Sequence, residues 1–419
     1  MSTASPIASD TDRQTVELLL RFTRSAHEAG GYPANELEPR VAELGDALGL
    51  HGVQVSATPT VVEIAVGSIP QQQVYVLRVK PHPVDLYTIG RLDEISAAVA
   101  DGRIDRRRAL DEISELHGHP LRRPRSLVVL VHGVIGAALA PIVGGGWRES
   151  IGAALVGLTV GFLTRVILRG ERFEALVSPL GAFVASFFAS VLACAGFGIA
   201  VANVTFAALV VLLPGMLMVI GIRELAAHHL EAGVANSVGA LVQLVGLAFG
   251  VAVGRSLVAT WLGPIPTTSP EGFGVAVKII AAAVVGLGFV ITLRASLRDA
   301  RWTCGAAVLA IVANLVTSAF FGEVAGVFVA SLVVGIVGNV IGRRLRHSSL
   351  AFIVPGLLML VPASIGFESA DNLLAGWTLT GIGTAFDTIV TLLAIAYGFL
   401  AATIALPIKS PTSPAHTAS

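Results

Sequence analysis

Apolar stretches of membrane-spanning length occupy most of the chain beyond residue 125. Each is close to the roughly 20 residues that an α-helix needs to cross a bilayer. The charge-free run 175–222 is too long for one span, and Gly196-Phe197-Gly198 is its natural turn. The pattern therefore predicts ten transmembrane helices, at approximately 126–145, 150–168, 175–195, 198–220, 234–260, 273–293, 302–320, 323–342, 349–367 and 377–406.

The segment before residue 122 is more polar and shows both helical and strand periodicity. The pattern predicts a helix after residue 15, a helix over 35–50, three strands beginning near 53, 60 and 74, and helices over 84–100 and 105–116. We expect a small α+β domain over 13–121. The polar ends, 1–12 and 407–419, are expected to be disordered tails.

Basic residues are distributed unevenly between the predicted loops. The loops on one side carry Arg165, Arg169, Arg172, Arg223, Arg294, Arg298, Arg301, Arg343, Arg344, Arg346 and Lys409, and those on the other side carry Arg148. Cytoplasmic loops hold the excess of Lys and Arg, so both termini and the α+β domain are predicted to be cytoplasmic. The first 20 residues also lack the basic start and apolar core of a signal peptide.

Two similar phrases interrupt the apolar runs. LLPGMLMVIG contains Pro214-Gly215, and IVPGLLMLVP contains Pro355-Gly356. Proline removes a backbone donor and clashes with the preceding turn, and glycine tolerates unusual backbone angles. In a bilayer such a break survives where protein or a water-filled cavity satisfies the freed carbonyls. We therefore expect both pairs to break their helices beside a transport path.

Ten spans divide into two sets of five, and an odd number makes the second set enter the membrane from the opposite side. We expect two inverted five-helix repeats, 126–262 and 273–406, each with one of the breaks. Strict inversion would put the second break nearer the outer face than Pro355. Pro362, about two turns further on, is the alternative counterpart of the first break.

Composition narrows the class of function. The chain is 54% hydrophobic and 13% charged, whereas soluble domains carry about 25% charged residues. Its zero formal net charge gives no support to a nucleic-acid partner. Cys194 and Cys304 stand alone in apolar runs and are interpreted as buried fillers. The sequence contains no phosphate loop, zinc-ligand cluster or nucleophile elbow, so we expect no metal, no cofactor, no catalytic residue and no enzyme.

Asp387 is the outstanding ionisable residue of the predicted spans. No other Asp, Glu, Lys or Arg lies between Asn372 and Ile408. A carboxylate at membrane depth costs about 2.5–3.5 kcal/mol on insertion scales, which favours a functional role. We interpret Asp387 as the proton-coupling group, with a buried hydrogen bond between helices as the alternative. The corresponding position of the first half, counted back from the equivalent glycine, is Gln243.

Polar amides inside the spans are candidate substrate ligands. They are Gln243, Asn203, Asn314 and Asn339. Each could bind the carboxylate or the ammonium group of an amino acid, or could simply join two helices.

Arg223 and Glu224 follow the first Pro-Gly pair and open the amphipathic stretch IRELAAHHLEAG. We interpret them as an inner gate. The alternative is a solvated loop, where an ion pair is worth little. Arg255 and Lys278 lie near the outer ends of their spans, where they would reach the interface or attract carboxylates.

Several motifs resemble the threonine/serine exporter family of bacterial membrane proteins. LLLRFTRSAHEAGGYPANELEPRVAELGDALGL, LLPGMLMVIGIREL and VPGLLMLVP occur in the family's order, and the resemblance covers nearly the whole chain. It implies export of small hydroxy amino acids across the bacterial inner membrane, driven by the proton gradient. Glu224 stands where the family pattern has Asp, and His228-His229 replaces its Gly-Asp. Some members built from two polypeptides are associated with dicarboxylate export.

We therefore expect a secondary exporter of threonine and serine, with substrate, protons and membrane lipid as partners and a homo-oligomer left open. A dicarboxylate exporter of the same architecture is the first alternative, and Arg255 and Lys278 would then matter more. A second alternative is a membrane-anchored signalling or scaffold protein whose soluble domain is the active part. An intramembrane hydrolase is disfavoured because the sequence offers no paired nucleophile and base.

Overall fold

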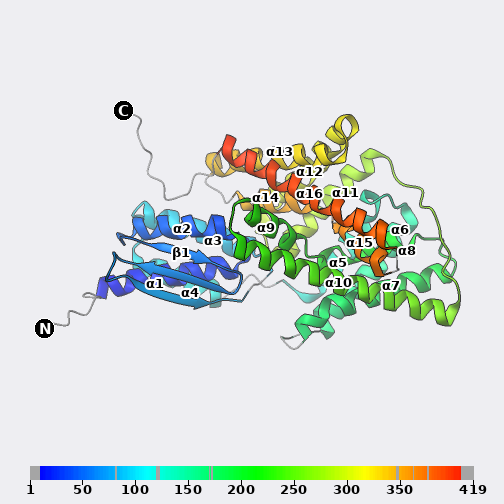
Figure 1. Cartoon of the computed structure of the whole chain (residues 1–419), viewed down its shortest axis with the longest axis horizontal. Helices are drawn as coiled ribbons and strands as arrows, with labels where there is room; N and C mark the ends of the chain where they lie inside the picture. Colours follow the sequence, from blue (N-terminus) through cyan, green and yellow to red (C-terminus); the bar gives the residue numbers. More distant parts are fainter. Residues whose placement is uncertain are drawn as a thin grey trace.

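The computed structural model describes residues 10–80, 83–118, 123–168, 170, 173–345, 349–361, 363–374 and 377–406. Figure 1 shows an elongated molecule, with a small α+β body at one end and a larger helical body at the other. Helix α1 begins at Asp10, so the tail predicted over 1–12 overlaps a helix. Residues 1–9 and the tail predicted over 407–419 lie outside the described residues.

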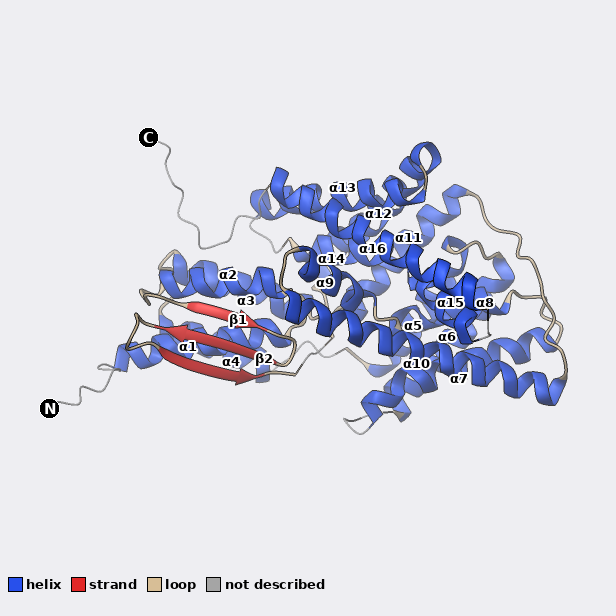
Figure 2. Ribbon diagram, in the orientation of Figure 1, coloured by secondary structure: helices blue, strands red, loops and turns tan. Residues whose placement is uncertain are grey.

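The α+β body has the predicted order of elements. They are α1 (Asp10–Glu28), α2 (Ala34–Ala47), β1 (Gln54–Ala57), β2 (Val61–Val66), β3 (Gln73–Arg78), α3 (Leu86–Ala100) and α4 (Arg106–Gly118). The strands pair antiparallel in the order β1-β2-β3, with Val55 opposite Ile64 and Ile64 opposite Tyr75 (Figure 2). Val62 and Ile64 are buried and Glu63 is exposed, because alternate strand residues point to opposite faces. The buried face therefore joins the core formed with the helices.

The helical body contains the predicted membrane spans. Its elements are α5 (Arg125–Ile142), α6 (Trp147–Phe162), η1 (Leu163–Ile167), α7 (Glu174–Cys194), α8 (Val201–Leu209), η3 (Val210–Leu212), α9 (Gly215–Ala226), α10 (Leu230–Leu262), α11 (Val275–Thr292), η4 (Leu297–Asp299), α12 (Ala300–Phe321), α13 (Glu323–Leu345), α14 (Leu350–Leu360), α15 (Ala363–Leu374) and α16 (Thr378–Ala405). Among the described residues, nine segments are long and apolar enough to cross a membrane. A bent pair, Val201–Leu212 with Gly215–Ala226, makes ten if it counts as one span. The inverted relation between the two halves stays a prediction.

The first Pro-Gly pair breaks its span as predicted. Leu213 is extended (φ −67°, ψ 139°), and Pro214 precedes the first turn of α9. The residue before a proline avoids the α conformation, and proline itself cannot donate to the preceding turn. The segments on the two sides of this break differ in direction by 67°. Pro214 and Gly215 therefore separate two half-helices.

The prediction of a second break at Pro355 and Gly356 is wrong, because both residues lie within the continuous helix α14. Pro355 frees the carbonyl of Ala351, four residues earlier. The hydroxyl of Thr303 on α12 lies 3.4 Å from that carbonyl oxygen and 3.2 Å from the carbonyl oxygen of Asp299, so its one hydrogen is shared between the two acceptors. A donor from a neighbouring helix thus lets α14 continue through its proline. The interruption comes later: α14 ends at Leu360 and α15 begins after Pro362, which is outside the described residues.

Small residues let α10 and α7 pack closely, and this packing predicts an asymmetric effect of two glycine substitutions. A Cβ added to Gly254 would lie 2.7 Å from the carbonyl oxygen of Phe183, whereas one added to Gly246 meets nothing within 4 Å. Gly254→Ala is expected to destabilise the protein by about 1–3 kcal/mol through overpacking. Gly246→Ala is expected to be neutral or stabilising by up to about 1 kcal/mol, because alanine favours the helix.

The midpoints of thermal unfolding of the two purified variants and the wild type, measured in the same detergent, test the two expected effects. A lower midpoint for Gly254→Ala beside an unchanged or higher midpoint for Gly246→Ala supports the packing. Equal midpoints for the two variants would contradict the close approach of α7 and α10.

Candidate functional site

The two interruptions of the helical body lie against each other. A Cβ on Gly215, the first residue of α9, would lie 3.5 Å from Val361, the extended residue after α14. One turn into α15, a Cβ on Gly366 would lie 3.7 Å from Met218 of α9. The start of α9 therefore lies beside the end of α14, and the side chain of Met218 reaches α15. Helix amino termini carry unpaired N–H groups and partial positive charge, so the start of α9 favours an anionic group.

Gln243 lies beside the first break, where its amide supports the backbone. Its Nε2 donates to the carbonyl oxygen of Leu212 at 2.8 Å and to the hydroxyl of Ser178 at 3.1 Å. Leu212 ends the turn before the break, so its carbonyl has lost its helical donor. Gln243 thus satisfies one of the groups that the break sets free.

The three predicted asparagine ligands lie on three different helices, α8, α12 and α13. Each has a hydrogen bond among the described residues: Asn203 Nδ2 donates to Val143 O (3.1 Å), Ser318 Oγ donates to Asn314 Oδ1 (3.1 Å) and Asn339 Nδ2 donates to Leu406 O (2.9 Å). These bonds fix helix ends or stay within one helix. They do not bring the three amides into one cluster, and their role in substrate binding stays a prediction.

Asp387 lies on α16, and its side chain is on the exterior of the helical body. The next residue, Thr388, is buried and faces α15, since a Cβ on Gly366 would lie 3.3 Å from its methyl group. Asp387 itself is exposed, as are its apolar neighbours Ile382 and Phe386. Asp387 therefore lies on the helix that packs against α15, with its own side chain exposed.

Arg223 and Glu224 are buried, with 7% and 2% of their surfaces exposed. They lie in the last turn of α9, at the junction between the helical body and α2 of the α+β body. The alternative of a solvated inner loop is therefore wrong. Charges after an apolar run resemble a membrane border in sequence, but here another part of the chain covers them.

Glu224 caps helix α2 from a distance. Its Oε1 accepts from the backbone N–H of Ala34 at 2.9 Å, and its Oε2 accepts from Nδ2 of Asn236 at 2.7 Å. The residue before α2 is Pro33, which has no side-chain acceptor for the first turn. A carboxylate at a helix amino terminus satisfies a free N–H and interacts favourably with the helix dipole. Glu224 therefore ties α2 to the helical body.

Arg223 makes the second tie, through an ion pair between its Nη2 and Oε1 of Glu36 in the first turn of α2. The side chains of this pair are 6% and 11% exposed. The guanidinium also lies 4.1 Å from the ring centroid of Phe399 on α16. Cation–π contacts strengthen where water is excluded. Arg223 thus joins α2, α9 and α16 at one point.

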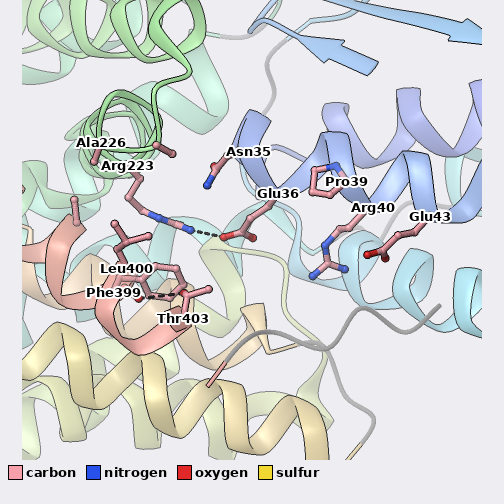
Figure 3. A pocket seen from close by; sticks show the side chains of 12 residues that line it. Asn35, Glu36, Pro39, Arg40, Glu43, Arg223, Ala226, Phe399, Leu400 and Thr403 are labelled. Carbon is pink, nitrogen blue, oxygen red and sulfur yellow. Dashed lines mark hydrogen bonds and ion pairs between the residues drawn. The ribbon is translucent and has the colours of Figure 1, made fainter. Parts of the chain in front are cut away.

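A pocket of about 280 Å³ opens beside this ion pair, between α2, α9 and α16 (Figure 3). Arg40 lines it from α2 and pairs with Asp93 at 2.8 Å. Burial acts to lower the pKa of Arg40, but Tyr32, Asp93, Glu36 and Glu43 together raise it above its ordinary value. Arg40 therefore stays charged in the pocket wall.

A further set of contacts holds the α+β body to the second half of the helical body. The backbone N–H of Leu86 donates to the carbonyl of Leu293 at 3.0 Å, and that of Tyr87 donates to the carbonyl of Arg294 at 3.2 Å. The Arg294 side chain also lies 3.3 Å from Asp85. Because Arg223 and Glu224 belong to the first half, the α+β body bridges the two halves.

Sequence reasoning missed the partners of Arg223 at this junction, Glu36 of α2 and Phe399 of α16, and it interpreted Asn35 as a helix cap, whereas α2 begins at Ala34 after Pro33. The segment PANELEPR showed a helix start with an acidic first turn, which is an ordinary feature. Nothing in a single sequence linked Glu36 to a partner 187 positions away.

Two protein-family models match the chain. One is described as "Putative threonine/serine exporter" and matches residues 19–258. The other is described as "Threonine/Serine exporter, ThrE" and matches residues 278–405. The matches run from the α+β body through α16, so they include both breaks and the junction.

The chain is also similar to fungal proteins that are longer. An uncharacterized protein of Schizosaccharomyces pombe is 23% identical over 404 residues, which are 90% of this chain and 52% of that protein. Pheromone-regulated membrane protein 10 of Debaryomyces hansenii is 25% identical over 312 residues, which are 67% of this chain and 30% of that protein. The chain thus spans about half the length, or less, of these relatives. No solved structure matches it.

Proposed function

The chain belongs to the threonine/serine exporter family, and from this premise we propose that it is a secondary transporter that exports threonine and serine, driven by the proton gradient. The family match supports a small-molecule substrate and a location in a membrane. We further propose a bacterial inner membrane, with both termini in the cytoplasm. The distribution of basic loops supports that orientation.

The observation that carries the proposal is the contact between the two interruptions. Helix α9 begins beside the α14–α15 connection, with Gly215 next to Val361. Broken helices whose ends meet are how many transporters bind a charged substrate near the bilayer midplane. We propose that the amino-terminal turns of α9 and α15 hold the substrate carboxylate. Backbone carbonyls at the ends of the preceding segments would face its ammonium group.

The junction at α2 is the proposed inner gate. Arg223 and Glu224 sit at the far end of α9, the half-helix whose other end lies at the break. Movement of α9 would therefore change the contacts at the break and the contacts of Arg223 and Glu224 together. Because the α+β body contacts both halves, releasing it would free them to move against each other.

Asp387 is the proposed proton carrier, and its exposure supports a homo-oligomer. An ionisable side chain inside a membrane protein usually faces a cavity or a partner rather than lipid. In the single chain, Asp387 is on the exterior among apolar side chains. A second copy of the chain could cover this face of α16.

Flux measurements in liposomes test the function. Purified protein is reconstituted, loaded with labelled threonine, serine or succinate, and given a pH gradient. Gradient-driven flux of threonine and serine, above that of empty liposomes and without succinate flux, is expected. Succinate flux that disappears when Arg255 and Lys278 are neutralised would replace the proposal with a dicarboxylate exporter. Flux of none of the three would overturn transport of either class and favour a signalling or scaffold role.

A further inference from the structure

Arginine side chains from three segments gather where the helical body meets the α+β body. Arg123 lies just before α5, Arg165 lies in η1 after α6, and Arg294 lies just after α11. The Nη2 atom of Arg123 donates to the carbonyl oxygen of Ala295 at 3.0 Å, so its guanidinium group reaches the residue next to Arg294. The start of α5 is thereby joined to the end of α11.

Helix packing brings the third arginine, Arg165, to the same place. A Cβ on Gly161, one turn before Arg165, would lie 3.2 Å from the carbonyl oxygen of Val129 on α5. A Cβ on Gly288, near the end of α11, would lie 3.6 Å from Val131 of α5. The ends of α6 and α11 therefore flank the same stretch of α5, which brings η1 near the end of α11.

The cluster carries more positive than negative charge. Arg294 lies 3.3 Å from Asp85, and its side chain remains half exposed. Arg165 is exposed and has no ion pair in the described part of the chain, and the like charge of Arg294 acts on it. Three guanidinium groups beside one carboxylate leave a surplus of positive charge. An anion placed between Arg165 and Arg294 would relieve their repulsion.

Exposed apolar side chains border the arginines. Ile167 follows Arg165 by two residues and Leu297 follows Arg294 by three, and both apolar side chains are exposed. Both segments belong to loops whose excess of basic residues marks the predicted cytoplasmic border of the membrane. A free phosphate ion gains nothing from apolar neighbours, whereas a phospholipid brings a charged headgroup and acyl chains together. The combination therefore favours a lipid over a free anion.

We propose that Arg123, Arg165 and Arg294 bind the headgroup of an anionic phospholipid in the cytoplasmic leaflet. Guanidinium groups suit phosphate oxygens, and basic pockets between transmembrane helices on the cytoplasmic side bind anionic headgroups. The backbone N–H of Tyr87 on α3 donates to the carbonyl oxygen of Arg294, so a lipid that holds Arg294 also stabilises this contact with the α+β body. The site rests on the proposed function in one respect, the orientation with the α+β body in the cytoplasm.

Native mass spectrometry of the full chain in detergent tests the site. Purified protein is mixed with phosphatidylglycerol or with phosphatidylcholine of the same acyl chains. The wild type is expected to bind phosphatidylglycerol about 10²-fold more tightly, because each of the three arginines contributes roughly fivefold near an anionic lipid. The double variant Arg165→Gln with Arg294→Gln is expected to bind phosphatidylglycerol about thirtyfold more weakly than the wild type and phosphatidylcholine equally well.

Two further double variants show whether charge at this place is what matters. Arg91→Gln with Arg108→Gln is the matched control, because it removes the same charge from two exposed arginines of the α+β body. It is expected to keep the preference for phosphatidylglycerol. Arg165→Lys with Arg294→Lys retains both positive charges and is expected to keep most of the preference.

Amide hydrogen exchange gives a second readout at the contact with the α+β body. Phosphatidylglycerol at ten times its dissociation constant is expected to slow exchange of the Tyr87 amide about tenfold, because that amide donates to the carbonyl of Arg294. Inorganic phosphate at the same concentration is the comparison probe and is expected to leave the exchange rate unchanged.

The outcomes separate the lipid site from the transport function. Equal affinity of the wild type for the two lipids would overturn the site, and so would an equal loss of affinity in the matched control. Inorganic phosphate that slows exchange as much as phosphatidylglycerol would replace the lipid with a free anion. Threonine flux in liposomes without a lipid preference would remove the lipid site and leave the exporter. A lipid preference without flux would remove the exporter and leave the lipid site.

Discussion

Gradient-driven threonine flux is expected to fall about 10²-fold or more when Asp387 is replaced by Asn, because the amide keeps the shape of the side chain but cannot carry a proton. Exchange of threonine for threonine without a pH gradient needs no net proton movement and is expected to survive. The measurement compares both kinds of flux in the same liposomes. This difference between coupled and uncoupled flux is specific to a proton carrier.

Glu323→Gln is the matched control for Asp387→Asn. Glu323 is another exposed carboxylate of the helical body, in the first turn of α13. Its neutralisation also removes one negative charge with little change of shape, yet it lies at a helix end where water is expected. Gradient-driven flux in Glu323→Gln should stay near that of the wild type. Equal gradient-driven flux in Asp387→Asn and the wild type would exclude Asp387 from coupling.

The positions of the spans could be predicted from sequence because hydropathy is a local property. A helix inside a bilayer must satisfy its backbone internally, so about 20 apolar residues are enough to identify it. The same reasoning placed the break at Pro214 correctly and failed at Pro355. Whether a proline breaks a helix depends on whether another hydrogen-bond donor reaches the carbonyl that has lost its N–H partner. At Pro355 the donor is the hydroxyl of Thr303, on a different helix, which no local pattern reveals.

The candidate site was less predictable, because its contacts join distant segments. Arg223 and Glu224 were found from their position after the first break, but their partners were not. Ala34 and Glu36 belong to a helix start that looks ordinary in sequence. Gln243 was identified by counting from a glycine, and its amide proves to hold the carbonyl of Leu212. Intervals along the chain can thus place a polar residue near a break without revealing which atoms it contacts.

Replacing Arg223 with Leu is expected to release α2 from the helical body. The substitution leaves Glu36 as a buried carboxylate without its partner, and breaking a buried ion pair in this way costs about 3–5 kcal/mol. Leucine keeps apolar contact with Phe399, so the main loss is the charge. Amide hydrogen exchange in the first turns of α2 is expected to speed by about 10²-fold or more in the full chain.

Arg91→Leu is the control, because Arg91 pairs with Glu94 and Glu112 at a surface position where its side chain is 39% exposed. Exposed pairs contribute about 0–1 kcal/mol, so exchange in α2 should change little.

Restoring opposite charges in the double variant Glu36→Arg with Arg223→Glu is expected to recover part of the protection. Such recovery would show that Arg223 holds α2 through its charge. If amide hydrogen exchange in α2 is equally fast in Arg223→Leu and Arg91→Leu, the buried ion pair does not hold the junction. If α2 is released and gradient-free leakage of threonine rises with it, the junction acts as the inner gate, because the same contact that holds the α+β body also holds the end of α9.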